Sequence, residues 1–149
     1  MLDQSQDLPV YVVSSTFGGA EGQGGICSNG GALSSIGVSW EVLNSVFSHN
    51  DAIGNGANPA RGGTPGGGSG GAIYLDGNLF TLRLAGTIVQ DNHANEGGGA
   101  VFFVSNDRSG TMVVEGSTLR RNPSDGFETF PGIFFLGARD PSFGGSTVE

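Results

Sequence analysis

The chain has 149 residues, enough for one domain and too few for two of ordinary size. Its 29 glycines and its 36% of apolar residues indicate a folded, glycine-dense protein. The net charge of −8, with arginine as the only basic residue type besides histidine, excludes lysine chemistry and argues against nucleic acid and anionic membranes as partners.

The N-terminal segment carries no sign of export or membrane insertion. Asp3 and Asp7 stand where a signal peptide needs positive charge, so we expect no signal peptide in this chain. No apolar run in the sequence reaches the length of a membrane span. We interpret residues 1–14 as an N-terminal tail or cap that precedes the repeated part of the chain.

Short stretches that end in an apolar residue recur along the sequence, and their last residues are Phe17, Phe47, Val89, Leu119 and Val148. The steps between them are 30, 42, 30 and 29 residues. The long step contains the Pro/Gly-rich segment 57–69, which we predict to be an inserted loop. Without this insertion, every step is close to 30 residues, which is the signature of a structural repeat.

Two further signals follow the same period. Glycine pairs at 30–31, 70–71 and 98–99 each open a strand-like run, and an asparagine follows the apolar residue by three positions at Asn50, Asn92 and Asn122. Each unit predicts short strands separated by turns, and none of these strands is long enough to bury itself. Repeated glycines suit corners that need positive φ, and asparagines at a repeated bend can form a hydrogen-bonded ladder.

The three signals together predict an all-β fold, a right-handed parallel β-helix (solenoid) of about four coils with a period of about 30 residues. Successive coils would pair in parallel about 4.8 Å apart, so that the inward residues form one column. Residues 1–149 would form a single parallel β-helix domain. Because so short a stack exposes sheet edges, we expect a homo-oligomer, most simply a dimer, formed through the exposed ends of the solenoid.

The glycine openings at 70–73 and 98–101, together with the F-x-x-N-type closings at 47–50 and 89–92, resemble the repeats of chlamydial polymorphic outer membrane proteins. More broadly, they are similar to bacterial right-handed parallel β-helix repeat proteins. The resemblance covers about residues 15–149. It implies a secreted or cell-surface protein, and it is compatible with adhesive and with carbohydrate-active members.

Stacking would turn sequence columns into rows on the surface. The residues just before the closing asparagines form the row His49, Asp91 and Arg121. An imidazole, a carboxylate and a guanidinium at steps of about 5 Å could perform acid/base work or orient an anion. The alternative is a solvated ladder whose alternating charges avoid repulsion between neighbouring strands.

The corner after each asparagine is rich in carboxylates, including Asp51, Glu96 and Asp125, and it also holds His93. Coils one or two steps apart would separate equivalent acids by about 5 or 10 Å, which brackets the spacings used by retaining and inverting glycosidases. Asp and Asn oxygens there could also hold calcium, as in pectate lyase-like β-helices, where an Arg or Lys serves as base. Acidic turn residues that merely face water are the third interpretation. The candidate catalytic residues are Asp51, Asp91, His93, Glu96, Arg121 and Asp125.

Aromatic residues suggest a further surface. Phe102 and Phe103 are adjacent, as are Phe134 and Phe135, so one of each pair must point outward and could form an apolar strip for a partner or for self-association. Tyr74 could stack on a sugar if exposed, but its apolar run favours packing in the core or at a corner.

Two functions are compatible with these patterns. The first is a secreted or surface β-helix module, glycan-associated and non-catalytic. The alternative is a carbohydrate-active enzyme, a glycoside hydrolase or polysaccharide lyase, that uses carboxylates stacked on one flank. Carbohydrate is the expected partner in either case.

Overall fold

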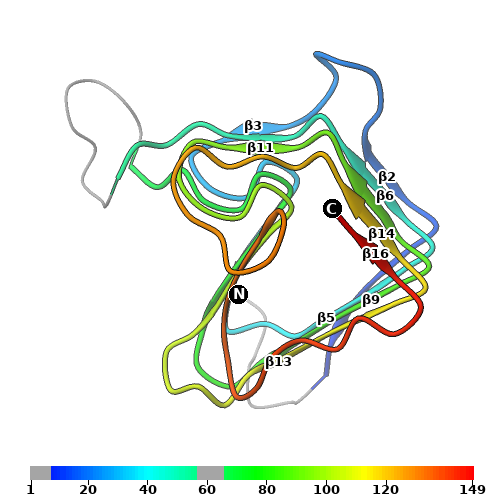
Figure 1. Cartoon of the computed structure of the whole chain (residues 1–149), viewed down its shortest axis with the longest axis vertical. Coiled ribbons are helices and arrows are strands. Elements are labelled where there is room, and N and C mark those ends of the chain that lie inside the picture. The colour runs from blue at the N-terminus through cyan, green and yellow to red at the C-terminus, as the bar shows by residue number, and fades with distance from the viewer. Residues whose placement is uncertain (1–7, 57–65) are drawn as a thin grey trace.

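A computed structural model describes residues 8–56 and 66–149, and these form strands with no helix among them (Figure 1). The strands lie in four sheets, and neighbouring strands in every sheet run parallel. The all-β prediction with parallel strand pairing is therefore confirmed. Most of the predicted inserted loop, 57–69, falls outside the described residues.

Each sheet contains strands that are far apart in the sequence. The first sheet, in the order β1-β5-β9-β13, consists of β1 (Val10–Val13), β5 (Trp40–Leu43), β9 (Thr81–Ala85) and β13 (Thr111–Glu115). The second, β16-β14-β10-β6-β2, consists of β2 (Thr16–Gly18), β6 (Val46–Ser48), β10 (Ile88–Gln90), β14 (Thr118–Arg120) and β16 (Thr147–Val148). The segment 1–14, interpreted above as a tail or cap, thus contributes strand β1.

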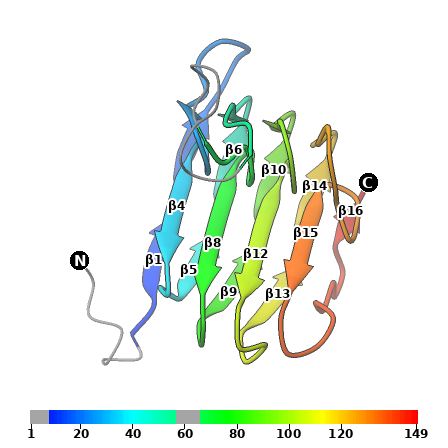
Figure 2. The same ribbon diagram turned by 90° about the vertical axis from the view of Figure 1, so that its left-hand side faces the viewer.

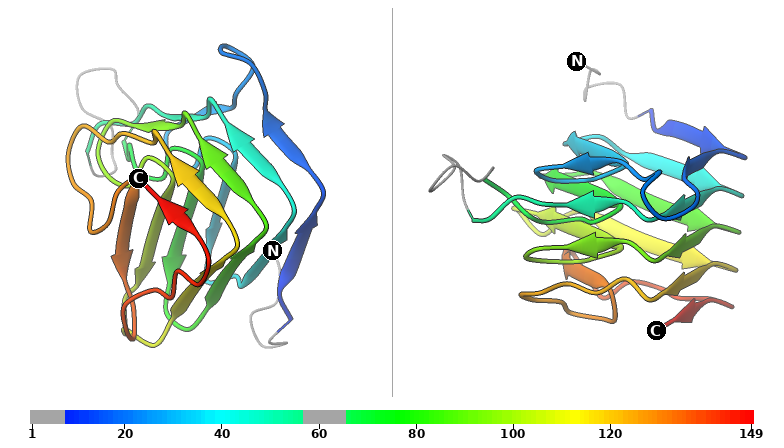
Figure 3. Two further views of the ribbon diagram at one scale, coloured as in Figure 1. Left: turned by 45° about the vertical axis from the view of Figure 1, so that its right-hand side comes forward. Right: turned by 90° about the horizontal axis from the view of Figure 1, so that it is seen from above.

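The third sheet, β11-β7-β3, consists of β3 (Ile26–Cys27), β7 (Asp51–Ala52) and β11 (His93–Ala94). The fourth, β15-β12-β8-β4, consists of β4 (Leu33–Ile36), β8 (Ile73–Gly77), β12 (Val101–Ser105) and β15 (Ile133–Leu136). Figure 2 shows this fourth sheet face on, with its strands side by side and pointing the same way. The first described strand, β1 in blue, and the last, β16 in red, lie at opposite ends of the stack of strands (Figure 3).

The pairing register follows the period of the sequence. In the second sheet, Phe17 pairs with Phe47, Phe47 with Val89, Val89 with Leu119, and Leu119 with Val148. Although 42 residues separate Phe47 from Val89, these two pair directly, so the extra residues of the long step leave the register unchanged. The repeat read from the sequence is therefore the repeat of strand pairing.

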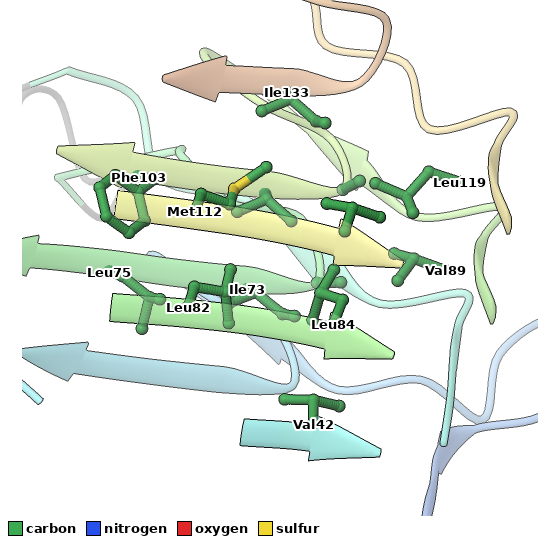
Figure 4. Packing of buried hydrophobic residues seen from close by; sticks show 14 of the residues in the cluster. Val42, Ile73, Leu75, Leu82, Leu84, Val89, Phe103, Met112, Leu119 and Ile133 are labelled. Carbon is green, nitrogen blue, oxygen red and sulfur yellow. The ribbon is translucent and has the colours of Figure 1, made fainter. Parts of the chain in front are cut away.

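The core lies between the sheets and is filled by the inward side chains of successive strands (Figure 4). Val42, Leu84 and Val114 occupy equivalent positions on β5, β9 and β13, and each is fully buried. In the fourth sheet, equivalent positions on β8, β12 and β15 are occupied by fully buried residues, namely Ile73, Val101 and Ile133. Because the inward residues alternate with half-exposed ones along β8 and β12, each of these strands has one face in the core and one outside.

Two rows of polar side chains lie beside the second sheet, and all of them except Ser146 are buried. In the first, a hydroxyl on each turn of the chain accepts a hydrogen bond from the backbone N–H of the equivalent residue: Thr87 accepts from Ser45, Ser117 from Thr87, and Ser146 from Ser117. The distances are 3.4, 3.0 and 3.1 Å. The sequence patterns did not predict this row, although its members stand in the same aligned stretches as Phe47, Val89 and Leu119.

The second row is the asparagine ladder predicted from the sequence. The side-chain oxygen of Asn92 accepts hydrogen bonds from the backbone N–H and the side-chain Nδ2 of Asn50, at 3.0 and 2.9 Å. Asn122 accepts the same pair from Asn92, at 3.2 and 2.9 Å. All three side chains are buried, so these bonds satisfy amides that water does not reach.

Left-handed backbone marks the corners between sheets. Gly30, Gly70, Gly98 and Gly132 have φ of 61°, 70°, 64° and 71° just before the strands of the fourth sheet. The first glycine of each pair is therefore explained by a conformation that other residues adopt only at an energetic cost. The second glycine, at positions 31, 71 and 99, has no positive φ, but a Cβ there would collide with the backbone of a neighbouring segment.

Candidate functional site

The predicted row of His49, Asp91 and Arg121 lies at a corner with left-handed backbone. Their φ values are 58°, 57° and 52°, although none of them is glycine. Arg121 donates two hydrogen bonds to Asp91, from Nε to Oδ1 at 2.6 Å and from a terminal nitrogen to Oδ2 at 2.8 Å. His49 is bonded elsewhere, since its Nδ1 lies 2.9 Å from the carbonyl oxygen of Gly19.

The ion pair governs the chemistry of Asp91. The hydrogen bonds from Arg121 hold the pKa of Asp91 below its usual range, and Asp91 in turn raises the pKa of Arg121. Both oxygens of the carboxylate are occupied, and the charge is compensated. This geometry favours the ladder of alternating charge over acid/base work at this row.

A second group brings together three of the candidate residues. His93 lies between two carboxylates, with Nδ1 3.3 Å from Asp51 Oδ1 and Nε2 3.3 Å from Asp125 Oδ2. Asp51 and His93 are paired positions on β7 and β11, and Asp125 follows the bridge that joins Ala94 to Ser124. An imidazole held this way could pass a proton between the two acids.

The Asp51–His93–Asp125 group lies at the protein surface. The Asp125 side chain is 67% exposed, against 40% for Asp51 and 35% for His93, so water surrounds much of it. Within residues 8–56 and 66–149, no cluster of three or more His, Cys, Asp or Glu is arranged to hold a metal ion. The calcium hypothesis, which also draws on asparagine oxygens, therefore has no assembled set of carboxylates in the described part of the chain.

Glu96 lies apart from both groups and lines a pocket of about 360 Å³. Its backbone N–H donates to Gly68 O at 2.8 Å, and its carbonyl accepts from Gly126 and Phe127, each at 2.9 Å. These bonds hold the Glu96 backbone between Gly68 and the turn at 126–127. The pocket is lined by Asn29, Gly56, Gly67, Ser69, Tyr74, Glu96, Phe102 and Phe127.

Aromatic rings form one wall of this pocket. Tyr74, Phe102 and Phe134 occupy paired outward positions on β8, β12 and β15. Their rings stack, with centroids 5.0 Å apart for Tyr74 and Phe102 and 5.2 Å for Phe102 and Phe134. The outward strip expected from the phenylalanine pairs is thus present, and Tyr74 continues it rather than packing in the core.

Phe127 contacts the strip of stacked rings. Its ring lies edge-on to Phe102 and Phe134, with centroid distances of 6.5 and 4.8 Å. Gly97 makes this position available, because a Cβ at residue 97 would collide with the Phe127 ring. The missing side chain of Gly97 therefore shapes the pocket.

Tyr74 is oriented by a neighbouring acid. Its hydroxyl donates to Asp76 Oδ2 at 3.3 Å. Burial, with the charge of Asp76 and this hydrogen bond, raises the pKa of Tyr74 to about 12. The phenol is consequently a hydrogen-bond donor at the edge of the pocket, and it stays protonated at neutral pH.

The structure thus divides the six predicted site residues into three places. Asp91 pairs with Arg121, His93 lies between Asp51 and Asp125, and Glu96 lines the pocket. Sequence reasoning missed Asn29 and Phe127 as parts of a site, and for Tyr74 it favoured core or corner packing over stacking on a sugar. The signal for Tyr74 was present, because it stands in the same column as Phe102 one residue after the inward position.

In comparisons with protein-family models, curated proteins and solved structures, no significant match was found for this chain. In the described part of the chain, no helix is long and apolar enough to cross a membrane.

Proposed function

We propose that this chain is a right-handed parallel β-helix of about four coils that serves as a secreted or cell-surface module and binds glycans. Two features support the fold: the chain visits the four parallel sheets in a fixed order, and a register of about 30 residues joins neighbouring strands. The likeness of the glycine openings and asparagine closings to bacterial β-helix repeat proteins supports the location.

The observation that carries glycan binding is the aromatic pocket. Sugar rings present apolar C–H faces that pack on aromatic rings, and their hydroxyl groups bond to amides and carboxylates. Here Phe102 and Phe127 supply ring surface, while Asn29 and Glu96 supply polar atoms beside it. The volume of about 360 Å³ falls at the lower end of the range for small-ligand sites.

The test is a titration of the 149-residue protein with a panel of neutral, acidic and amino oligosaccharides. We expect at least one to bind, and we expect Phe127→Ala to weaken that binding about tenfold or more, because it removes a pocket wall. Leu79→Ala is the matched control, since Leu79 is an exposed apolar residue that does not line the pocket. Absence of binding across the panel, or equal losses in the two variants, would overturn the proposal.

A second candidate function is catalysis on a polysaccharide, and the Asp51–His93–Asp125 group favours it. Its two acids are held on either side of an imidazole, so one could act as acid and the other as base. Aryl glycosides and acidic polysaccharides, offered with and without calcium, test this activity. Turnover that is lost in His93→Asn would support catalysis at this group, and turnover that survives would place it elsewhere.

We further propose that the 149-residue chain self-associates. Strand β1 is an edge of the first sheet, and its Tyr11 and Val13 are 62% and 52% exposed. An exposed parallel edge with apolar side chains is a template for pairing with another chain. Size-exclusion chromatography with light scattering should give a dimer at micromolar concentration, and a strict monomer of 15.1 kDa would contradict this.

A further inference from the structure

Among the residues that the structure describes, the lining of the aromatic pocket holds one carboxylate and no basic side chain. Glu96 is the one charged residue among the lining residues that the structure describes. Within residues 8–56 and 66–149, no ion pair joins its carboxylate to a basic side chain. A half-buried carboxylate beside aromatic rings is stabilised when a cation lies against it.

Glycines keep this carboxylate accessible from the pocket. A Cβ at Gly56 would lie 3.8 Å from Glu96 Oε1, and a Cβ at Gly68 would lie 3.0 Å from Glu96 Cγ. Both positions have φ in the left-handed region, 85° and 107°, so the backbone itself favours glycine there. A side chain at residue 68 would crowd Cγ of Glu96, and one at residue 56 would touch its carboxylate, so neither of these two positions covers Glu96 with a side chain of its own.

The aromatic wall faces the same volume. Tyr74, Phe102 and Phe127 line the pocket together with Glu96. Phe102 is stacked between Tyr74 and Phe134, whereas Tyr74 stacks on Phe102 by one face, so the other face of Tyr74 is the ring surface that can attract a cation. A site with ring faces on one side and a carboxylate on the other is selective for an organic cation, because a metal ion would find too few oxygen ligands. A neutral sugar would satisfy the rings and leave the carboxylate without a countercharge.

We propose that the pocket recognises an amino sugar with its amine protonated, such as a glucosamine unit of an oligosaccharide. This assignment rests on the proposed glycan-binding function and names its ligand class. The ammonium group would lie against Glu96 and the face of Tyr74 that does not stack on Phe102, and the sugar body would pack on Phe127. The net charge of −8 would further attract a cationic glycan to the protein.

The experiment compares two trisaccharides that differ only in N-acetylation and hence in charge: a glucosamine trimer and its fully N-acetylated form. Both are titrated calorimetrically into the 149-residue protein at about pH 6, where the amines are protonated. We expect the glucosamine trimer to bind about tenfold more tightly than the acetylated trimer. Glu96→Gln should abolish this preference and leave the affinity for the acetylated trimer unchanged.

Controls separate a specific cation site from attraction to an acidic surface. Glu21→Gln removes the same charge from an exposed position in the loop between β2 and β3, and it should keep the preference. Tetramethylammonium chloride, which carries the cation without the sugar, should displace the glucosamine trimer where an equal concentration of sodium chloride does not.

The outcomes distinguish this inference from the function on which it rests. Equal affinities for the two trimers, or a preference that persists in Glu96→Gln, would overturn the amino-sugar assignment and leave glycan binding standing. Binding of tetramethylammonium without binding of the glucosamine trimer would also overturn it. If neither trimer nor any other glycan binds, the proposed function itself fails.

Discussion

The asparagine row inside the molecule and the aromatic pocket outside it are built from the same repeat in different ways. Three successive repeats supply the row with an identical residue, and the strand register alone brings Asn50, Asn92 and Asn122 into contact. The pocket takes only its ring strip from the repeat. Glu96 and Phe127 belong to the corner that follows each asparagine, where paired positions carry different residues, such as Gly97 opposite Phe127, so the variable part of the repeat creates the recognition surface.

The two regions also differ in what a substitution should change. Asn92 is fully buried, and both ends of its amide are engaged, so its loss should affect folding. Phe127 is 43% exposed, so its loss should affect binding more than folding. Paired substitutions can therefore test whether the interior stabilises the molecule while the exterior recognises a ligand.

The largest expected effect is that of Asn92→Ala. This change removes the amide that donates to Phe47 O and that accepts from the backbone N–H of Asn50. Buried groups left without a partner cost about 1–3 kcal/mol each, so the free energy of unfolding should fall by about 3 kcal/mol or more. Urea unfolding followed by circular dichroism measures this change.

Asn106→Ala is the matched control. Asn106 also bonds across a step of the repeat, to Asp76 Oδ1 at 2.9 Å and to Gly77 O at 3.0 Å, but it is exposed. Because water can replace those bonds, we expect a loss of about 1 kcal/mol or less. Similar losses in the two variants would mean that burial does not set the importance of the asparagine row.

Gly97→Ala should damage the pocket more than the fold. The new methyl group would displace the Phe127 ring, while the backbone at residue 97 has no left-handed φ that would penalise alanine. We expect glycan affinity to fall about tenfold with a smaller change in the urea midpoint. Titration of wild type and variant with the best ligand of the panel measures the effect.

Gly144→Ala serves as the control for this substitution, because a Cβ at residue 144 would meet no atom within 4 Å. It should leave both affinity and stability unchanged. If Gly97→Ala binds glycan as well as this control does, the ring of Phe127 is not part of the binding surface.

The regular part of the molecule could be predicted from the sequence because one physical requirement recurs in three successive repeats. An inward apolar residue followed three positions later by a buried asparagine specifies both burial and hydrogen bonding, and Val89 and Leu119 consequently pair as expected. The interruption by residues 57–69 did not obscure the register, since an insertion at a corner leaves the paired strands in place.

The pocket could be predicted only in part, for a physical reason. The outward position of Phe102 follows from strand alternation, but the position of Phe127 depends on the empty space at Gly97. Glu96 is among the predicted residues, yet no sequence pattern separates it from Asp51 and Asp125, because loop geometry decides which carboxylates share a site. The sequence predicts that Tyr74 packs in the core or at a corner, because its neighbours along the chain are apolar. Its alignment with Phe102 is the weaker signal, although it gives the position that the structure shows.

The smallest expected effect concerns the ion pair of Asp91 and Arg121, which lies on the exterior. Asp91→Asn removes the charge but keeps a residue that tolerates the left-handed backbone there, with φ of 57°. Since Arg121 is 56% exposed, we expect only a small fall in the urea midpoint at neutral pH.

The pH dependence identifies the source of that fall. The pKa of Asp91 is lowered in the folded protein, so its stabilising contribution is present above the ordinary carboxyl pKa of about 4. The contribution is lost as the pH falls through the lowered value. Wild type and Asp91→Asn should therefore converge in stability at acidic pH, while Asp140→Asn, at an exposed position, should match wild type throughout. A gap between wild type and Asp91→Asn that stays constant down to about pH 2 would show that the substitution acts through packing at the corner and not through charge.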